Sequence, residues 1–166
     1  MKPALTLVFV LCATIQVQSQ TPSSTERNRI GTGVEDPVID FYDSMSDYFR
    51  NTNRAIMAIH AKGIPDQEIP AVLLIARRSS ASPNQVIAAR KSGKSWPEIA
   101  KANNVSLAGD DFVKEANIVF LSEYHGRKPD EVRAMLAKGA DFLAINQEFR
   151  RDGKGVPKRT EEQKQR

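Results

Sequence analysis

The sequence is poor in the residue types that usually carry chemistry or covalent cross-links. Its 166 residues include one cysteine, Cys12, and two histidines, His60 and His125. A single cysteine can form no internal disulfide and no cysteine-ligated metal cluster. The sequence also contains no HExxH pattern, no glycine-rich phosphate loop and no nucleophile elbow. We therefore predict no catalytic residue, no metal site and no cofactor.

The histidines also lack the spacing of a paired metal or acid–base site. Each lies near the predicted end of a helix, where a protonated imidazole would interact favourably with the helix dipole. Asp110 and Asp111 are the acid pair most suited to catalysis, but directly before Phe112 they are more simply the solvated start of a helix. An enzyme of unknown class is therefore the second alternative among the possible functions.

No apolar run is long enough to span a membrane, which takes about 20 residues. The longest run, residues 4–15, follows Lys2 and precedes a polar stretch that contains the small residues Val17 and Ser19. This order is typical of a secretory signal, with cleavage after Ser19, although a buried core helix is the alternative. The mature chain would keep no cysteine, and export without disulfides is common in bacteria. We predict an exported bacterial protein, periplasmic or secreted, without a membrane span after cleavage.

No segment alternates convincingly between apolar and polar residues with period two, so we predict no strands. Apolar residues recur at helical spacing instead, for example in a helix expected to begin at Pro65 and Asp66 and to continue past Ile69. The expected fold class is all-α, with about eight short helices in which duplicated hairpins pack as a small irregular bundle. The domains expected are a signal peptide (1–19), a disordered linker (20–36), an all-helical repeat domain (37–151) and a disordered basic tail (152–166).

The stretch SPNQVIAARKSGKSWPEIA reads as two short helices joined by a turn. Ser82 followed by Pro83 is typical of a helix start, and Gly93 supplies the positive φ that commonly ends a helix. Ser95 and Glu98 fit a capping box at the start of the second helix. The sequence therefore predicts a helical hairpin whose joint is the glycine.

The same pattern of proline, glycine and apolar residues recurs 46 residues later without a gap. The identical pairs are Pro83/Pro129, Val86/Val132, Ala88/Ala134, Gly93/Gly139 and Ile99/Ile145. Trp96 corresponds to Phe142, and this exchange of large apolar residues favours core filling by Trp96 over an exposed binding anchor. A fainter third copy precedes both and places Gly63 at the joint. We expect Gly93 and Gly139 to have positive φ and Ile99 to lie in the core.

Charge is distributed unevenly along a chain of net charge +4. Residues 77–101 carry six basic residues against Glu98 alone: Arg77, Arg78, Arg90, Lys91, Lys94 and Lys101. Residues 34–47 carry five acids and no base. One interpretation is a set of solvated helix faces that attract one another weakly. The other is a docking surface for an anionic partner.

Part of the hairpin, VIAARKSGKSWPEIAKANNVS, resembles the first two helices of a bacterial helix-turn-helix. The resemblance implies that LAGDDFVKEA would be the recognition helix, whose acids Asp110, Asp111 and Glu115 outnumber Lys114. Such a helix would meet phosphates unfavourably. Nucleic-acid binding through a degenerate helix-turn-helix is therefore the first alternative.

Residues 63–105 resemble more closely a group of exported bacterial helical proteins of unassigned function. The shared pattern is SPxxVxxxRxxGxSWxxI, preceded by a helix that follows Ile64 and Pro65 and contains AVLLIAR. In the second copy Leu136 replaces the arginine and Phe142 the tryptophan. This resemblance implies an all-helical fold and export, and implies no reaction.

The sequence thus favours an exported helical module for macromolecular interaction or structural packing. The candidate interaction surface is formed by Arg90, Lys91 and Lys94, and its expected partner is an anionic protein or envelope component. The second copy does not retain these three residues as a set.

Overall fold

The computed structural model describes residues 36–153, and this part of the chain is all-α, as predicted. It contains eight α-helices, one 3₁₀ helix (η1) and no strand. In chain order the elements are α2 (Pro37–Phe49), α3 (Asn53–His60), η1 (Asp66–Glu68), α4 (Ile69–Arg78), α5 (Pro83–Lys91), α6 (Trp96–Ala102), α7 (Phe112–His125), α8 (Pro129–Ala137) and α9 (Phe142–Arg151). The predicted signal peptide and nearly all of the predicted linker and tail lie outside the described residues.

Side chains cap most of these helices, and the caps at Ser82 and Ser95 are those predicted. The Ser82 hydroxyl accepts from the Gln85 amide, and the Gln85 side chain accepts in return from the Ser82 amide at 2.7 Å. Ser95 and Glu98 form the same reciprocal pair at the start of α6. Asp111 caps α7 by accepting from the Lys114 amide at 3.1 Å. These contacts satisfy amide groups that a helix leaves unpaired at its start.

The two hairpins close with the same backbone turn. Gly93 has φ of 90° and Gly139 has φ of 92°, which confirms the prediction for both joints. Past each glycine, the Lys94 amide donates to the Ala89 carbonyl at 3.3 Å, and the Ala140 amide donates to the Met135 carbonyl at 3.1 Å. Both bonds join residues five apart, as in a Schellman motif. The hydrogen bonds that end α5 therefore recur 46 residues later at the end of α8.

The helix predicted to begin at Pro65 and Asp66 is interrupted in its first turn. Residues 66–68 form η1, and α4 begins only at Ile69. Pro70 has no N–H, so it cannot donate to the carbonyl of Asp66 as a continuous α-helix would require. That carbonyl accepts instead from the amide of Ile69, three residues on, in the 3₁₀ pattern. The prediction of a continuous helix was wrong at this point.

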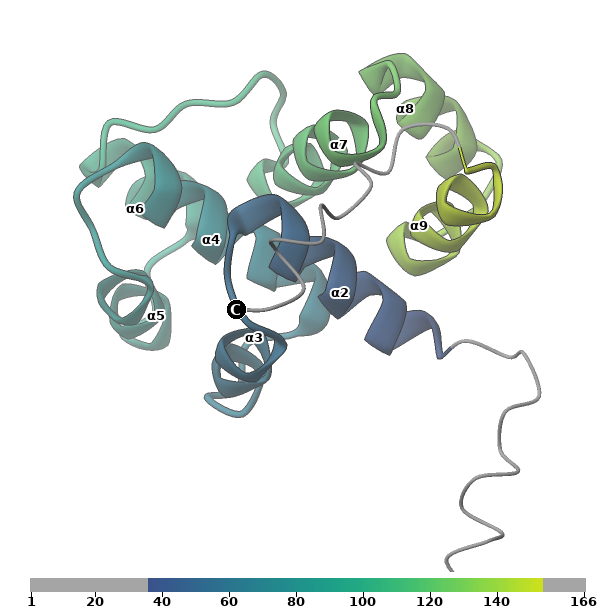
Figure 1. The fold of residues 1–166 in the computed structure, drawn as a ribbon. Helices are drawn as coiled ribbons and strands as arrows, with labels where there is room; N and C mark the ends of the chain where they lie inside the picture. The colour runs from purple at the N-terminus through teal and green to yellow at the C-terminus, as the bar shows by residue number, and fades with distance from the viewer. Residues whose placement is uncertain (1–35, 154–166) are drawn as a thin grey trace, which may run out of the picture. The chain divides into compact units, whose positions relative to one another are not determined.

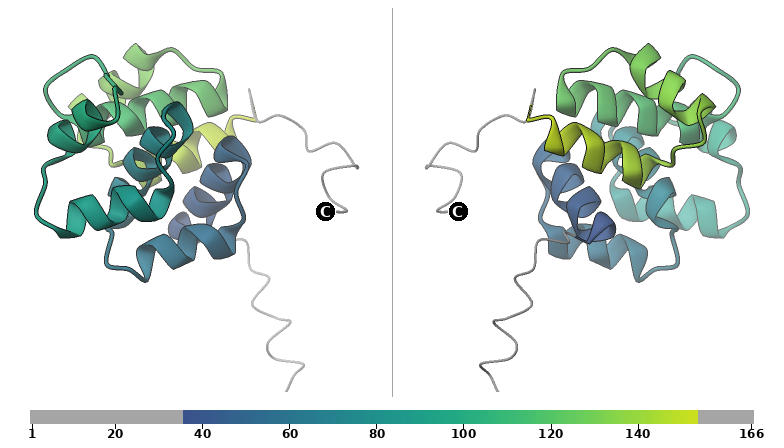
Figure 2. Two further views of the ribbon diagram at one scale, coloured as in Figure 1. Left: turned by 90° about the vertical axis from the view of Figure 1, so that its left-hand side faces the viewer. Right: turned by 90° about the vertical axis from the view of Figure 1, so that its right-hand side faces the viewer.

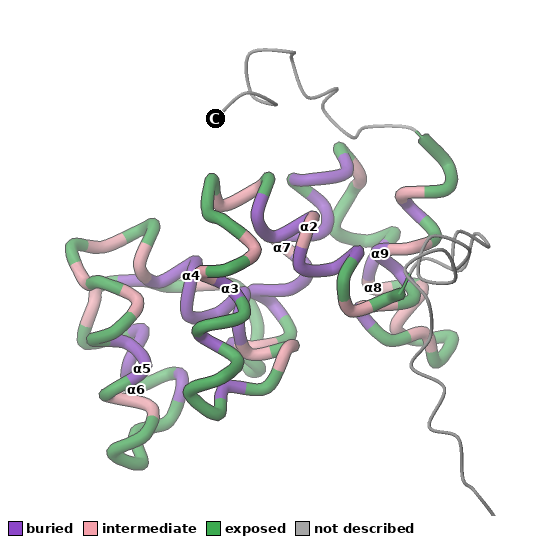
Figure 3. The backbone as a smooth tube through the Cα atoms, turned by 60° about the horizontal axis from the view of Figure 1, so that its bottom comes forward, coloured by how far each residue is buried: buried purple, intermediate pink, exposed green. Residues whose placement is uncertain are grey.

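The apolar core lies mainly between α2, α4 and α7. Phe41 and Met45 of α2, Ile75 of α4 and Phe120 of α7 are fully buried, and α7 packs against α2, α4, α6, α8 and α9. The α5–α6 hairpin and the α8–α9 hairpin lie on opposite sides of these central helices (Figure 1). Burial is concentrated along α4, α7 and the inner face of α2 (Figure 3).

The hairpins insert the predicted residues into this core. Trp96 is 5% exposed, which confirms core filling over an exposed binding anchor, and Ile99 is 1% exposed. Their counterparts Phe142 and Ile145 are buried as well. The apolar spacing of the hairpins therefore identified their inward faces correctly.

The first and last described helices pack side by side (Figure 2). Arg150 of α9 lies 3.5 Å from the buried carboxylate of Asp40 in α2. Beside this pair, Nε2 of His125 in α7 lies 2.9 Å from the Asn146 side-chain oxygen in α9. Polar contacts between residues far apart in the sequence therefore accompany the apolar packing where α2, α7 and α9 meet.

His125 is fully buried and not a charged residue at a solvated helix end. Its pKa is lowered, chiefly by burial, while Arg150 and Arg127 lower it further and the Asn146 hydrogen bond opposes the shift. Its Nδ1 atom has no hydrogen-bond partner within the described part of the chain. The expectation of a protonated imidazole stabilising the helix dipole was therefore wrong for this residue.

We predict that replacing Gly93 with alanine lowers the free energy of unfolding by about 1–2 kcal/mol. A Cβ at this position would meet no atom within 4 Å, so the cost arises from the positive φ alone. Gly93→Asn should cost less, because asparagine tolerates this conformation better. Urea denaturation of the three proteins measures the order, and an alanine variant as stable as the parent would contradict it.

We predict that the free energy of unfolding falls as the pH drops below about 6.5, where a free histidine takes up its proton. Because folding lowers the pKa of His125, the unfolded chain binds that proton first, and protonation favours unfolding. Urea denaturation at pH 7.5 and pH 5.5 should show a smaller loss in His125→Gln than in the parent. His60→Gln, which removes the other histidine, is the control; an unchanged loss in His125→Gln would contradict the assignment.

Candidate functional site

The predicted interaction residues lie where α5 ends and the turn to α6 begins. Arg90 and Lys91 form the last turn of α5, and Lys94 follows the glycine joint. The structure thus brings the three residues together on one short segment. Their side chains, however, have different surroundings.

Arg90 is engaged within the fold. Its Nε and Nη2 donate to the two carboxylate oxygens of Glu68 at 3.2 and 2.9 Å, which makes a bidentate ion pair between α5 and η1. The guanidinium also lies over the Trp96 ring, 5.3 Å from its centroid. A planar guanidinium suits both contacts, and a lysine could reproduce neither fully. Arg90 therefore holds the hairpin against the element that precedes α4.

Lys91 and Lys94 are exposed and have no ion-pair partner among residues 36–153. The acid closest in sequence, Glu98, is occupied by the capping box. Hydrogen bonds from the side chain and backbone of Ser95 lower the pKa of Glu98, and the charge of Lys94 lowers it further. The carboxylate therefore remains bound to the start of α6, and the two ammonium groups face solvent.

The other basic residues of the segment 77–101 also divide into arginines that contact the fold and a lysine without an ion pair. Arg77 lies over the Tyr48 ring at 4.7 Å, and Arg78 lies 3.9 Å from Glu123. Lys101 is exposed, without an ion pair in the described part of the chain. In this segment each arginine interacts with a side chain of another element, whereas none of the three lysines has an ion-pair partner among residues 36–153.

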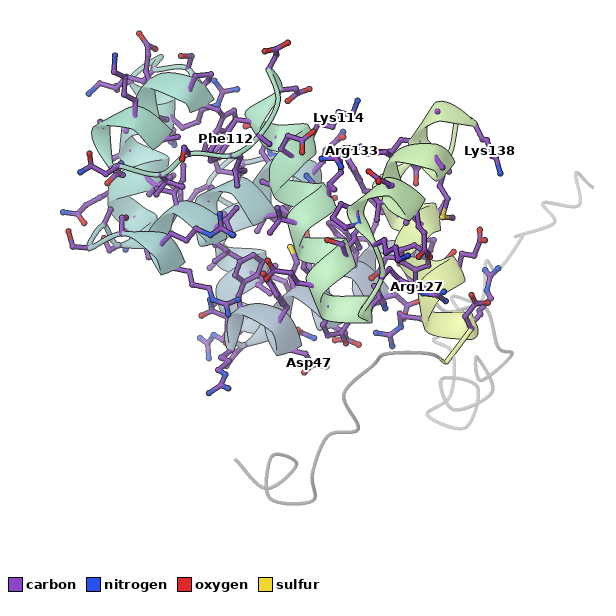
Figure 4. The ribbon with its side chains drawn as sticks, turned by 90° about the horizontal axis from the view of Figure 1, so that it is seen from above. Asp47, Phe112, Lys114, Arg127, Arg133 and Lys138 are labelled. Atoms are coloured by element: carbon purple, nitrogen blue, oxygen red, sulfur yellow. The ribbon has the colours of Figure 1, made fainter. Side chains whose placement is uncertain are left out.

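The second hairpin offers a different surface at the same backbone positions. Leu136, Ala137 and Ala140 stand 46 residues after Arg90, Lys91 and Lys94. Its lysines, Lys128 and Lys138, flank α8 at its two ends and are exposed. Lys138 points away from the end of α8 (Figure 4). The basic segment is therefore a property of the first hairpin and not of the shared turn.

A second polar group, which the sequence analysis did not anticipate, joins α2, α3 and η1. The Asp66 carboxylate lies 2.7 Å from Nδ1 of His60 and accepts from the Tyr42 hydroxyl at 2.5 Å. Burial, and next the contact with Asp66, raise the pKa of Tyr42. Asp66 is separated from its partners by 6 and 24 residues, so no local motif marks the group. It ties three elements together near the surface.

The described residues also bear on metal, membrane and DNA-binding sites. Within residues 36–153 there is no group of three or more side chains suited to a metal ion, and no helix is both long and apolar enough to cross a membrane. The recognition helix expected at residues 107–116 is not formed over its first half, because residues 107–111 are not helical and α7 begins only at Phe112. Most of α7 is buried, including Phe112 and Glu115 of its first turn. A helix covered by its own fold cannot enter a DNA groove as a recognition helix does, and this burial is unfavourable for the nucleic-acid alternative.

We predict that Arg90→Ala lowers the free energy of unfolding by about 1–3 kcal/mol, because it leaves the partly buried Glu68 carboxylate without its partner. Arg90→Lys should recover only part of this loss, since it keeps the charge without the bidentate geometry. A double-mutant cycle with Glu68→Gln measures the coupling between the two side chains. A coupling energy of zero would contradict the structural role given to Arg90.

Comparison with known proteins gives no matching family model, no matching curated protein and no matching solved structure. The resemblances to exported helical proteins and to the helix-turn-helix therefore rest on the sequence patterns alone.

Proposed function

We propose that this chain is an exported helical-repeat module that binds an anionic macromolecule of the cell envelope through the basic surface of its first hairpin. The surface consists of Lys91 and Lys94, and Arg90 holds the segment that carries them. The observation that carries the proposal is the division between engaged arginines and free lysines in residues 77–101. Charges that serve the fold are paired, and Lys91 and Lys94 are left for another molecule.

The repeat interpretation is supported by the closing turns. Gly63, Gly93 and Gly139 have φ of 84°, 90° and 92°, and the last two end their helices with matching hydrogen bonds. A duplicated hairpin explains this match, and it also explains why one copy can carry a binding surface while the other does not. Export rests on the apolar run at residues 4–15, which lies outside the described residues.

The electrostatics of the segment favour association with an acidic surface. Replacing an exposed lysine changes the stability of the fold little, since even an exposed ion pair contributes at most about 1 kcal/mol. Their effect on an encounter with an oppositely charged partner is larger, since complementary charges raise the association rate and oppose dissociation. Such binding should weaken as the salt concentration rises.

We predict that the double variant Lys91→Glu/Lys94→Glu loses about tenfold or more in recovery of a periplasmic partner, because repulsion replaces attraction. The measurement is a pull-down with the parent and the variant, at low and at high salt, quantified by mass spectrometry. Arg90 is left unchanged, so the hairpin keeps its contact with Glu68.

The matched control is Lys128→Glu/Lys138→Glu, which makes the same change in net charge on the second hairpin. It should recover the partner as the parent does. Equal loss in both variants would show that only net charge matters, and equal recovery in all three proteins would reject the basic surface altogether.

A further inference from the structure

A pocket of about 460 Å³ lies beside the basic hairpin, between the end of α6, the segment that follows it and the start of α7. This volume is in the range of sites that hold small ligands. The apolar part of its wall comes from Pro97, Ala100, Val105, Leu107 and Phe112. Phe112, at the start of α7, supplies the aromatic ring (Figure 4).

The backbone on both sides of the pocket is held by specific contacts. At the end of α6, Asn104 has φ of 55°, and the Val105 amide returns to the Ala100 carbonyl at 2.9 Å. On the other side, Gly109 has φ of 97° and approaches Glu115 so closely that a Cβ would lie 3.0 Å from that side chain. Glu115 is in turn fixed by Arg133 at 2.8 Å. These contacts fix the backbone on both sides of the pocket.

Four polar side chains line this pocket: Lys101, Asn104, Ser106 and Asp110. Lys101 and Asp110 are its only charged lining residues, one positive and one negative. No side-chain hydrogen bond or ion pair joins any of the four to another residue of the range 36–153. The pocket thus combines an apolar wall with one unpaired cation, one unpaired anion and two neutral polar groups.

We propose that this pocket binds a small zwitterion with a large apolar side chain, that is, a hydrophobic α-amino acid. The carboxylate of such a ligand pairs with Lys101, its ammonium group pairs with Asp110, and its side chain lies against Leu107 and Phe112. A purely anionic ligand would leave Asp110 as a repulsive neighbour, and a purely cationic one would leave Lys101 in that position. Only a ligand with both charges satisfies both residues. This inference does not depend on the proposed function of Lys91 and Lys94.

L-phenylalanine is a suitable probe, and two analogues each remove one of its charges. 3-Phenylpropanoate lacks the ammonium group, and 2-phenylethylamine lacks the carboxylate. Titration of the ¹⁵N-labelled chain, followed by amide chemical shifts, should show saturable changes between residues 97 and 112 for phenylalanine. Each analogue should bind about tenfold more weakly, because it loses one charge-assisted contact.

The variants Lys101→Met and Asp110→Asn test the two charged contacts separately. Lys101→Met should weaken the binding of phenylalanine and strengthen that of 2-phenylethylamine, which loses a repulsive neighbour. Asp110→Asn should likewise weaken the binding of phenylalanine and strengthen that of 3-phenylpropanoate. Lys138→Met, at the exposed end of α8, is the control and should bind as the parent does.

Two results would overturn the assignment. One is the absence of saturable shifts around the pocket at millimolar phenylalanine. The other is an analogue that binds as tightly as phenylalanine, which would show that only one of the two charges of the ligand contributes to binding. Thermal unfolding of each variant confirms that a loss of binding reflects the pocket and not the fold.

Discussion

The contact between Arg90 and Glu68 sets the position of the first hairpin, and the surface beside it depends on that position. The bidentate pair joins α5 to η1, and the guanidinium also lies over Trp96, which is buried in the core. One side chain therefore connects the start of α4, the end of α5 and the start of α6. With these elements fixed, Lys91 and Lys94 are displayed on a turn of defined geometry, and the end of α6 can form one wall of the pocket.

Local features of the fold could be predicted from the sequence, because each depends on a few neighbouring residues. The caps at Ser82 and Ser95 and the positive φ of Gly93 follow from backbone chemistry within one turn of helix. The inward position of Trp96 follows from helical spacing and from its match with Phe142. The exception was the start of α4, where a proline inside an apolar pattern changed the type of helix without ending it.

Contacts between distant residues could not be predicted. Arg90 was grouped with its lysine neighbours, and only the structure shows that its partner lies 22 residues earlier. His125 was expected to be charged, because its burial arises from α9, whose Asn146 and Phe149 cover it from another part of the chain. The pocket also depends on tertiary packing, since the close approach of Gly109 to Glu115 is not encoded in any local pattern. Charge patterns identified the basic segment, and packing decides which of its charges are paired within residues 36–153.

The central claim is that the fold uses Arg90 while Lys91 and Lys94 are free to bind a partner. The most direct test is an NMR titration of the ¹⁵N-labelled chain with the partner that the parent protein captures, following the backbone amides and the Nε–H group of Arg90. The account predicts shifts at Lys91 to Ser95, an unchanged Arg90 Nε–H signal and no change in the second hairpin. Shifts confined to α8 and α9, or an Arg90 signal that shows its release from Glu68, would contradict it.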